Sequence, residues 1–258
     1  MRNLIRVEFR KMRCYWVTWG VGLFFIANSV YSALRVSYAP GLVRYPAMEY
    51  VLCVYATARM LSIVTILLTA YVIAEDFSMR TVQNVFAAGI SRGKYYVSRL
   101  CAQMIFVFFL YSAGYAAYIV TRILSTGKVN TGMPAAEFLA VFFVMALQPL
   151  AYVAFTAMVS VFCKSQSVSM VAAEAWLVFS LVLRLYSIKE VPGGTGAVAY
   201  RGPIAYEPLT VLERSLDDFV FPGRVFTVDF FMCAISAVLI IAVSSVIGYL
   251  YLQRSDVR

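Results

Sequence analysis

Six long apolar runs constrain the fold of this chain more than any other feature. They cover residues 15–34, 50–73, 97–121, 136–162, 168–187 and 229–252. An α-helix needs about 20 predominantly apolar residues to cross the hydrocarbon core of a bilayer. The runs do not alternate apolar and polar residues, as the strands of a membrane β-barrel would. Because lipid cannot satisfy exposed backbone polar groups, the sequence predicts six transmembrane α-helices.

The composition supports a membrane-embedded chain. Hydrophobic residues make up 62% of the sequence and charged residues 14%, whereas soluble domains average about 45–50% and about 25%. The first apolar run is too long for the core of a signal peptide, and no small-x-small site closes it, so we interpret it as a retained span. We therefore expect an all-α polytopic membrane protein in which residues 1–258 form a single transmembrane domain.

The basic residues predict which ends of the spans face the cytoplasm. With six spans both chain ends lie on one side, and that side carries 12 of the 22 Lys and Arg residues. They are Arg2, Arg6, Arg10, Lys11, Arg13, Arg80, Arg92, Lys94, Arg99, Lys164, Arg254 and Arg258. Because cytoplasmic connections are enriched in Lys and Arg, both termini are predicted to be cytoplasmic, in a multi-pass protein of the plasma membrane. Anionic lipid headgroups account for the net charge of +9, so no nucleic-acid partner is expected.

Residues 1–14 are predicted to form an interfacial elbow helix before the first span. At about 100° per residue, one face carries basic side chains and the adjacent face apolar ones. These are Arg2, Arg6, Arg10 and Arg13, beside Ile5, Phe9, Met12 and Trp16. The pattern is typical of a helix that rests in the headgroup layer with its apolar side down. Such a helix would either pack on the bundle or a partner, or serve as a simple basic anchor.

Two charged residues fall inside predicted spans. They are Arg59 in the run 50–73 and Glu174 in the run 168–187. A charge at membrane depth costs about 2.5 kcal/mol or more, so each residue needs a polar environment. Arg59 and Glu174 are candidates for an intramembrane polar pathway or an ion pair. Alternatively, each snorkels or meets an internal water, or residues 46–58 form an outer re-entrant or surface helix.

The connection 188–228 is the longest, and it is predicted to be extracellular. Its first half is irregular because Pro and Gly recur in it. Leu209, Leu212, Leu216 and Phe219 then follow at helical spacing, which predicts a short amphipathic helix near the outer interface. This helix would be either an outer lid or a plain connector.

The residue inventory argues against an enzyme, a metal site or a bound cofactor. The chain has no histidine, the commonest metal ligand. Its five cysteines form no CxxC pair, so neither a thiol metal site nor a disulfide framework is expected. Gly127-Lys128 is followed by Val129 and lacks the glycine spacing of a Walker motif, so the chain is not expected to hydrolyse ATP.

The segment 74–96 is the longest polar interruption on the predicted cytoplasmic side. Projected as a helix, residues 78–88 place apolar and polar side chains on opposite faces. The apolar face carries Met79, Val82, Val85 and Phe86, and the polar face carries Arg80, Gln83, Asn84 and Ala87. Gly89 is a natural helix stop, and Ser91 is a candidate cap for the next helix. The sequence therefore predicts a short helix lying across the membrane surface between two spans.

The order of residues in this segment resembles the permease subunits of ABC-2 type ATP-binding-cassette transporters. The family pattern ends the second span in a glutamate and continues with a Thr-containing helix, a Gly-Ile-Ser-Arg-like turn and a Lys/Tyr-rich entry to the third span. Here these parts are Ile73-Ala74-Glu75, Arg80-Thr81-Val82-Gln83-Asn84, Gly89-Ile90-Ser91-Arg92 and Lys94-Tyr95-Tyr96. Arg80 replaces the usual glycine before the threonine. The basic start and the end of the chain also resemble the family. Within it, the chain is most similar to the small Gram-positive permeases that move antimicrobial peptides such as lantibiotics.

The resemblance implies a function and a set of partners. The residues Thr81–Ala88 would sit in a groove of a cytoplasmic ATPase, and Glu75 would pair with a nearby basic residue. The implied ATPase-coupling residues are Glu75, Arg80, Thr81, Val82, Val85, Phe86 and Arg92. A separate subunit would bind ATP and Mg²⁺, and this chain would work with a second copy or a related permease to export a hydrophobic or amphipathic substrate. The alternative is an ATPase-independent ion-gradient transporter or channel.

Overall fold

The described part of the chain folds almost entirely into α-helices. A computed structural model describes residues 2–38, 46–79, 81–127, 134–190, 198–200 and 228–255. The long elements are α2 (Trp16–Tyr38), α3 (Pro46–Ser78), α5 (Arg92–Thr126), α6 (Ala135–Cys163), α7 (Gln166–Ser187) and α9 (Val228–Arg254). The short ones are α1 (Arg2–Cys14), α4 (Thr81–Ala87) and the strands β1 (Ile188–Glu190) and β2 (Val198–Tyr200).

Long apolar helices in the described part of the chain fit a multi-pass membrane protein. Within it, five helices are long and apolar enough to cross a membrane. These five segments are Trp16–Leu34, Thr57–Ser78, Arg92–Ser125, Ala135–Cys163 and Phe230–Arg254. The sixth predicted span, 168–187, coincides with α7, which is not among the five and some of whose side chains lie outside the described residues.

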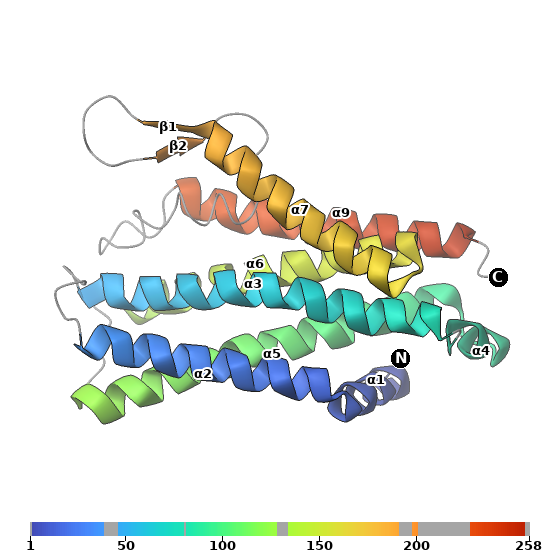
Figure 1. The fold of residues 1–258 in the computed structure, drawn as a ribbon, viewed down its shortest axis with the longest axis horizontal. Coiled ribbons are helices and arrows are strands. Elements are labelled where there is room, and N and C mark those ends of the chain that lie inside the picture. The colour runs from blue at the N-terminus through green and yellow to red at the C-terminus, as the bar shows by residue number, and fades with distance from the viewer. Residues whose placement is uncertain are drawn as a thin grey trace.

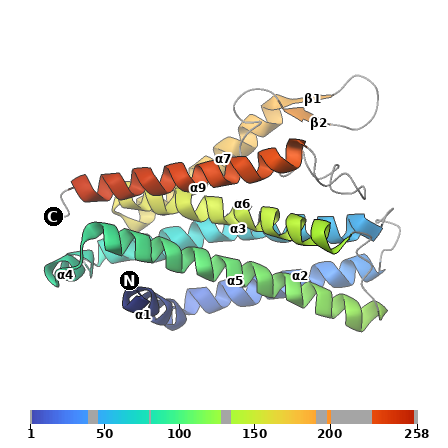
Figure 2. The same ribbon diagram turned by 180° about the vertical axis from the view of Figure 1, so that it is seen from behind.

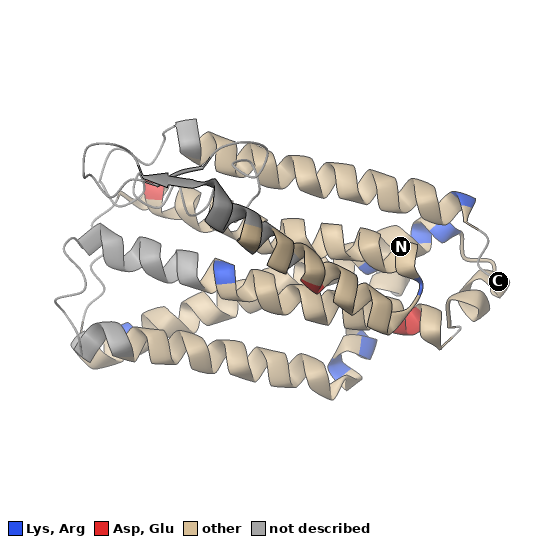
Figure 3. Cartoon of the chain, turned by 45° about the horizontal axis from the view of Figure 1, so that its top comes forward, with Lys and Arg blue, Asp and Glu red and all other residues tan. Residues whose placement is uncertain are grey.

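The helices form an up-and-down bundle with α3, α5 and α6 at its centre. Successive long helices run in opposite directions, and α7 crosses the bundle obliquely (Figures 1 and 2). Helix α6 packs against α3, α5, α7 and α9. Both termini, α1 and α4 lie at one end of the bundle, which we call the terminal end (Figure 1). Most of the described Lys and Arg residues also gather there, and few charges lie along the middle of the helices (Figure 3).

Several helices extend beyond the apolar runs that predicted them. Helix α3 is continuous over its 33 residues, about 50 Å at 1.5 Å per residue, so residues 46–58 do not form a separate re-entrant or surface helix. Its last turn includes Glu75 and Asp76, and α5 begins at Arg92. The predicted connecting segment 74–96 therefore begins with the end of α3, contains α4 and finishes with the start of α5. Hydropathy marks where the apolar side chains stop, whereas the backbone hydrogen bonds of a helix continue into polar sequence.

A helix is present where the elbow helix was predicted, as α1, with one correction to its apolar face. Helix α1 ends at Cys14, and Tyr15 separates it from α2. Trp16 therefore belongs to α2, where it is 81% exposed and does not continue the apolar face of α1. Met12, by contrast, is buried, and Arg6, Arg10 and Arg13 are exposed. The two faces of α1 thus follow the predicted pattern up to Tyr15, where the helix is interrupted.

The connection after α7 begins with a hairpin that the sequence analysis did not predict. The strands β1 and β2 pair antiparallel, with Ile188 opposite Tyr200 and Glu190 opposite Val198. The hairpin lies at the end of the bundle opposite to the terminal end (Figure 1). The amphipathic helix predicted around Leu209–Phe219 lies outside the described residues.

Helices α5 and α9 approach closely because each places a glycine under a tyrosine of the other. A Cβ atom on Gly93 would lie 2.5 Å from Cε2 of Tyr249. A Cβ atom on Gly248 would lie 2.3 Å from the hydroxyl oxygen of Tyr96, which is buried. The two glycine–tyrosine contacts are reciprocal and hold α5 against α9 near the terminal end.

We expect Gly248→Leu to lower the melting temperature of the purified protein. The leucine and the Tyr96 ring would compete for the same space, and overpacking of a core typically costs about 1–3 kcal/mol. Gly20→Leu is the control, because no atom lies within 4 Å of a Cβ at Gly20. A Tyr96→Leu change in the Gly248→Leu background should recover part of the loss. Equal melting temperatures for Gly248→Leu and Gly20→Leu would contradict this packing.

Candidate functional site at the terminal end

The short helix α4 bridges the ends of α3 and α5. It covers seven residues, Thr81–Ala87, and ends in a left-handed turn at Gly89, whose φ is +82°. The amide of Gly89 donates to the carbonyl of Phe86 (3.0 Å), and the amide of Ile90 donates to the carbonyl of Val85 (3.4 Å). This pair of bonds is the Schellman arrangement, in which glycine at the left-handed position avoids the Cβ clash. The predicted helix stop at Gly89 is therefore confirmed.

One face of α4 packs on the bundle, and the other is exposed. Val82 is fully buried, and Val85 and Phe86 are half-buried against the core. Asn84 and Ala87 are exposed. Met79 was predicted on the apolar face, but it precedes α4 and is 70% exposed. The structure thus places Val82, Val85 and Phe86 inward, toward this chain's own helices, and leaves the opposite face uncovered.

Phe86 connects α4 to two residues of α5. Its ring makes an edge-to-face contact with Tyr95, with centroids 5.7 Å apart. The guanidinium of Arg92 lies 5.7 Å from the centroid of the same ring. Arg92 also donates hydrogen bonds to the backbone carbonyls of Gln253 and Ser255. These carbonyls lie at the end of α9, where a cation is favoured by the helix dipole. Arg92 therefore joins α4, α5 and the end of α9.

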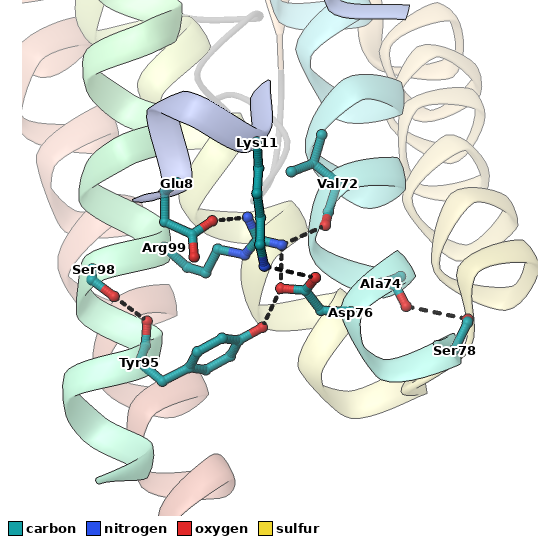
Figure 4. A network of polar contacts seen from close by, with 9 residues as sticks. All are labelled: Glu8, Lys11, Val72, Ala74, Asp76, Ser78, Tyr95, Ser98 and Arg99. Atoms are coloured by element: carbon teal, nitrogen blue, oxygen red, sulfur yellow. Dashed lines mark hydrogen bonds and ion pairs between the residues drawn. The ribbon is translucent and has the colours of Figure 1, made fainter. Parts of the chain in front are cut away.

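A buried ionic network lies directly behind this contact (Figure 4). Arg99 of α5 forms ion pairs with Glu8 of α1 and Asp76 of α3. It also donates to the backbone carbonyl of Val72, 3.1 Å away. Tyr95 donates to Asp76 at 2.8 Å. The network joins three helices, since α1, α3 and α5 each supply at least one member.

The central side chains of the network are almost completely buried, and its positive and negative charges are equal in number. Arg99 is 1% exposed, and Glu8 and Asp76 are each 4% exposed. Lys11 of α1 completes the set, with its ammonium group 3.4 Å from Asp76. Two carboxylates thus face two cations. Burial raises the pKa of the Glu8 carboxyl, and the charge of Arg99 opposes this shift. Buried ion pairs contribute little net stability but are costly to break, because the remaining charge loses its partner.

Glu75 does not take the role expected for it among the described residues. It was predicted to pair with a basic side chain, but its neighbour Asp76 makes the ion pairs with Lys11 and Arg99. The Glu75 carboxylate lies beside Tyr15, and burial followed by this contact raises the pKa of the Tyr15 hydroxyl. The Tyr15 ring also packs edge-to-face on Tyr71 of α3. Glu75 therefore contacts the junction between α1 and α2.

Three further residues of the predicted coupling segment can be compared with the structure. Thr81 is the first residue of α4 and is half-buried. Ser91 occupies the cap position of α5, but its side chain makes no capping hydrogen bond. Its backbone carbonyl instead accepts from the amide of Tyr95 at 3.0 Å. Arg80 lies outside the described residues.

Arg59 and Glu174 lie on neighbouring helices but are not joined. Helices α3 and α7 pack together, and Glu174 lines a groove between them with Leu67 of α3. Arg59 is eight residues from Leu67, about 12 Å along the helix. No ion pair between Arg59 and Glu174 occurs in the part of the chain that the structure describes. The groove around Glu174 is otherwise apolar, with Met170, Val171 and Val178 among its lining residues.

The sequence analysis missed the members of the buried network. Arg99 was counted only as a basic residue near the membrane surface, and Glu8 and Asp76 had no assigned role. A signal for Glu8 was present, because it is the only acidic residue on an otherwise basic helix. Nothing in the sequence spacing indicated its partner, which lies 91 residues away.

The described residues include no group of three or more cysteine or acidic side chains that could hold a metal ion.

Neither a protein-family model nor any curated protein matches the chain.

Proposed function

We propose that this chain is the transmembrane permease subunit of an ATP-binding-cassette transporter. The observation that carries the proposal is the position of α4. It is a short, capped helix between two long apolar helices, and its face with Asn84 and Ala87 is exposed at the terminal end. A soluble ATPase needs such a surface, and the motif resemblance at residues 73–96 supports this partner. In this proposal the terminal end faces the cytoplasm, as the basic residues predict.

The contacts behind α4 supply a path for movement from an ATPase to the bundle. A push on α4 would reach Phe86, whose ring contacts Tyr95 and Arg92 of α5. Tyr95 donates to Asp76 of α3, which is paired with Arg99. Glu8 carries the connection on to α1. A displacement of α4 would therefore be shared by α1, α3 and α5, since packed and ion-paired groups move together.

Two ATPase subunits would act on two permease chains, either copies of this chain or one copy with a related permease. ATP and Mg²⁺ would bind to the ATPases. The complex would export a hydrophobic or amphipathic substrate such as an antimicrobial peptide.

Purification from the native host in mild detergent tests the proposal. The expected result is that an ATP-binding-cassette ATPase subunit co-purifies with the chain and that the complex hydrolyses ATP. Ala87→Arg should reduce ATPase co-purification about tenfold or more, because a bulky charge at the centre of a protein interface costs about 2 kcal/mol or more. Ala87 is suitable because it is exposed, so the change leaves the chain's own packing intact.

Cys14→Arg is the matched control, since Cys14 is also exposed at the terminal end and receives the same side chain. Retention of the ATPase by Ala87→Arg at the control level would exclude docking through the outer face of α4. If no ATPase accompanies the unmodified chain, the permease proposal fails, and an ATPase-independent transporter or channel becomes the better explanation.

A further inference from the structure

A groove between α1, α2 and α5 combines a basic end with an apolar end. Its volume is about 380 Å³, within the roughly 300–1,000 Å³ range of small-molecule sites. Helix α1 contributes Phe9, Met12 and Arg13, and α5 contributes Phe106 and Leu110. The α2 wall consists of Thr18, Trp19, Gly22, Leu23 and Ile26. No residue of α4 lines the groove, so the groove has no part in the ATPase-docking proposal.

The basic end of the groove offers groups that suit a lipid headgroup. Arg13 is exposed at the end of α1. The indole of Trp19 donates to the backbone carbonyl of Arg13 at 2.8 Å and so fixes this corner. The guanidinium of Arg13 is the cationic group at this end of the groove.

The rest of the groove is apolar, and its α2 wall extends from Thr18 to Ile26. Gly22 and Ile26 lie four residues apart on α2, so they share one face of that helix. Leu110 of α5 closes the opposite side, and a Cβ atom on Gly22 would lie 3.8 Å from its Cδ1. Because Gly22 has no side chain, the space between α2 and Leu110 remains open and forms the groove. An extended hydrocarbon chain running along the membrane normal fits this shape.

The charges on α1 select for an anionic occupant. Arg6, Arg10 and Arg13 are exposed on this helix. Its only acidic residue, Glu8, is buried against Arg99 and does not neutralise them. Clusters of basic residues at the ends of membrane helices attract anionic lipids, with about 1 kcal/mol for each Lys or Arg near the surface. The groove therefore presents an acyl-chain slot directly below a positive corner.

We propose that this groove binds one anionic phospholipid of the surrounding bilayer. The guanidinium of Arg13 binds the phosphate. One acyl chain lies against Gly22, Ile26 and Leu110. The bound lipid joins α1 to α2 and α5, which places it next to the helix that carries Glu8 into the buried network. This inference depends on membrane embedding and not on the transporter proposal.

Lipid retention measured by native mass spectrometry tests the site. The purified chain, exchanged into detergent with equal amounts of phosphatidylglycerol and phosphatidylcholine, should retain one phosphatidylglycerol molecule in preference. Gly22→Leu should abolish this retention, because the new side chain fills the groove. Gly20→Leu is the matched control, since Gly20 lies two residues away on the same helix with no atom within 4 Å of its Cβ position.

A second pair of variants tests the headgroup contact. Arg13→Gln should reduce the preference for phosphatidylglycerol about fivefold, the fold-change that corresponds to one cation near a lipid surface. Arg10→Gln should change it less, because Arg10 does not line the groove. Retention of the same lipid by Gly22→Leu would overturn the site. Equal effects of Arg10→Gln and Arg13→Gln would overturn the headgroup assignment, since surface charge alone would then explain the preference. Unchanged circular dichroism shows that each variant is folded.

Discussion

Arg99→Met is expected to destabilise the purified protein severely. The change leaves the carboxylates of Glu8 and Asp76 buried without the guanidinium that pairs with both. Removing one partner of a buried ion pair typically costs about 3–5 kcal/mol. For a chain of this size, each kcal/mol shifts the melting temperature by roughly 2–4 °C, so a fall of about 6–20 °C is expected. Thermal unfolding in detergent, followed by tryptophan fluorescence, measures it.

Two comparisons separate the loss of charge pairing from the loss of an arginine in general. Arg13→Met removes an exposed arginine and should change the melting temperature by little. The triple variant Glu8→Gln, Asp76→Asn, Arg99→Met removes all three charges together. It should be more stable than Arg99→Met alone, because no buried carboxylate remains unpaired. If Arg99→Met unfolds at the same temperature as Arg13→Met, the network does not contribute as the structure indicates.

Val82→Asp is expected to release α4 from the bundle without unfolding the rest. Full burial of a side chain such as valine or phenylalanine contributes about 1.5–3 kcal/mol. With Val82 buried and Val85 and Phe86 half-buried, the docking of α4 contributes about 4–5 kcal/mol. Replacing the valine removes about 2 kcal/mol of this, and burying an unpaired carboxylate costs about 3 kcal/mol or more. The balance falls to about zero, so α4 leaves its site locally.

Hydrogen exchange of the backbone amides in residues 79–90 measures this release. In Val82→Asp these amides should exchange at least about tenfold faster, while those of α6 remain protected. Asn84→Asp is the control, because it introduces the same charge on the exposed face of α4. Equal protection of α4 in both variants would show that Val82 is not the anchor. Val82→Asp is therefore a poor probe of an ATPase contact, because it displaces the whole of α4 and does not alter only the exposed face.

The sequence predicted the helices well and their limits poorly. Apolar runs identify segments that must avoid water, so the six runs coincide with α2, α3, α5, α6, α7 and α9. The limits differ because capping and tertiary contacts decide them. Helix α3 continues through Ser78, beyond the apolar run, and Asp76 near its end is paired within the fold. The end of α1 at Cys14 agrees with the predicted range 1–14, but Trp16, which was placed on its apolar face, belongs to α2.

The candidate site was predicted where local chemistry determines it. The helical spacing of the apolar residues predicted α4. Gly89 predicted its end, because the left-handed backbone conformation after a helix favours glycine. The buried network depends instead on three segments that meet only after folding. A charged residue near a predicted membrane surface is ordinarily solvated, so the sequence offered no reason to bury Glu8, Asp76 and Arg99. The inward direction of Phe86 was equally hidden, since an amphipathic pattern does not say what the apolar face covers.

The reciprocal contacts between α5 and α9 limit how this protein can change shape. Tyr96 sits over Gly248, and Tyr249 sits over Gly93, so each ring occupies the space that the facing helix leaves open. A slide of one helix along the other would drive both rings into neighbouring backbone at once. The two contacts therefore favour one position of α5 relative to α9. Any rearrangement of the bundle should move α5 and α9 together at this end.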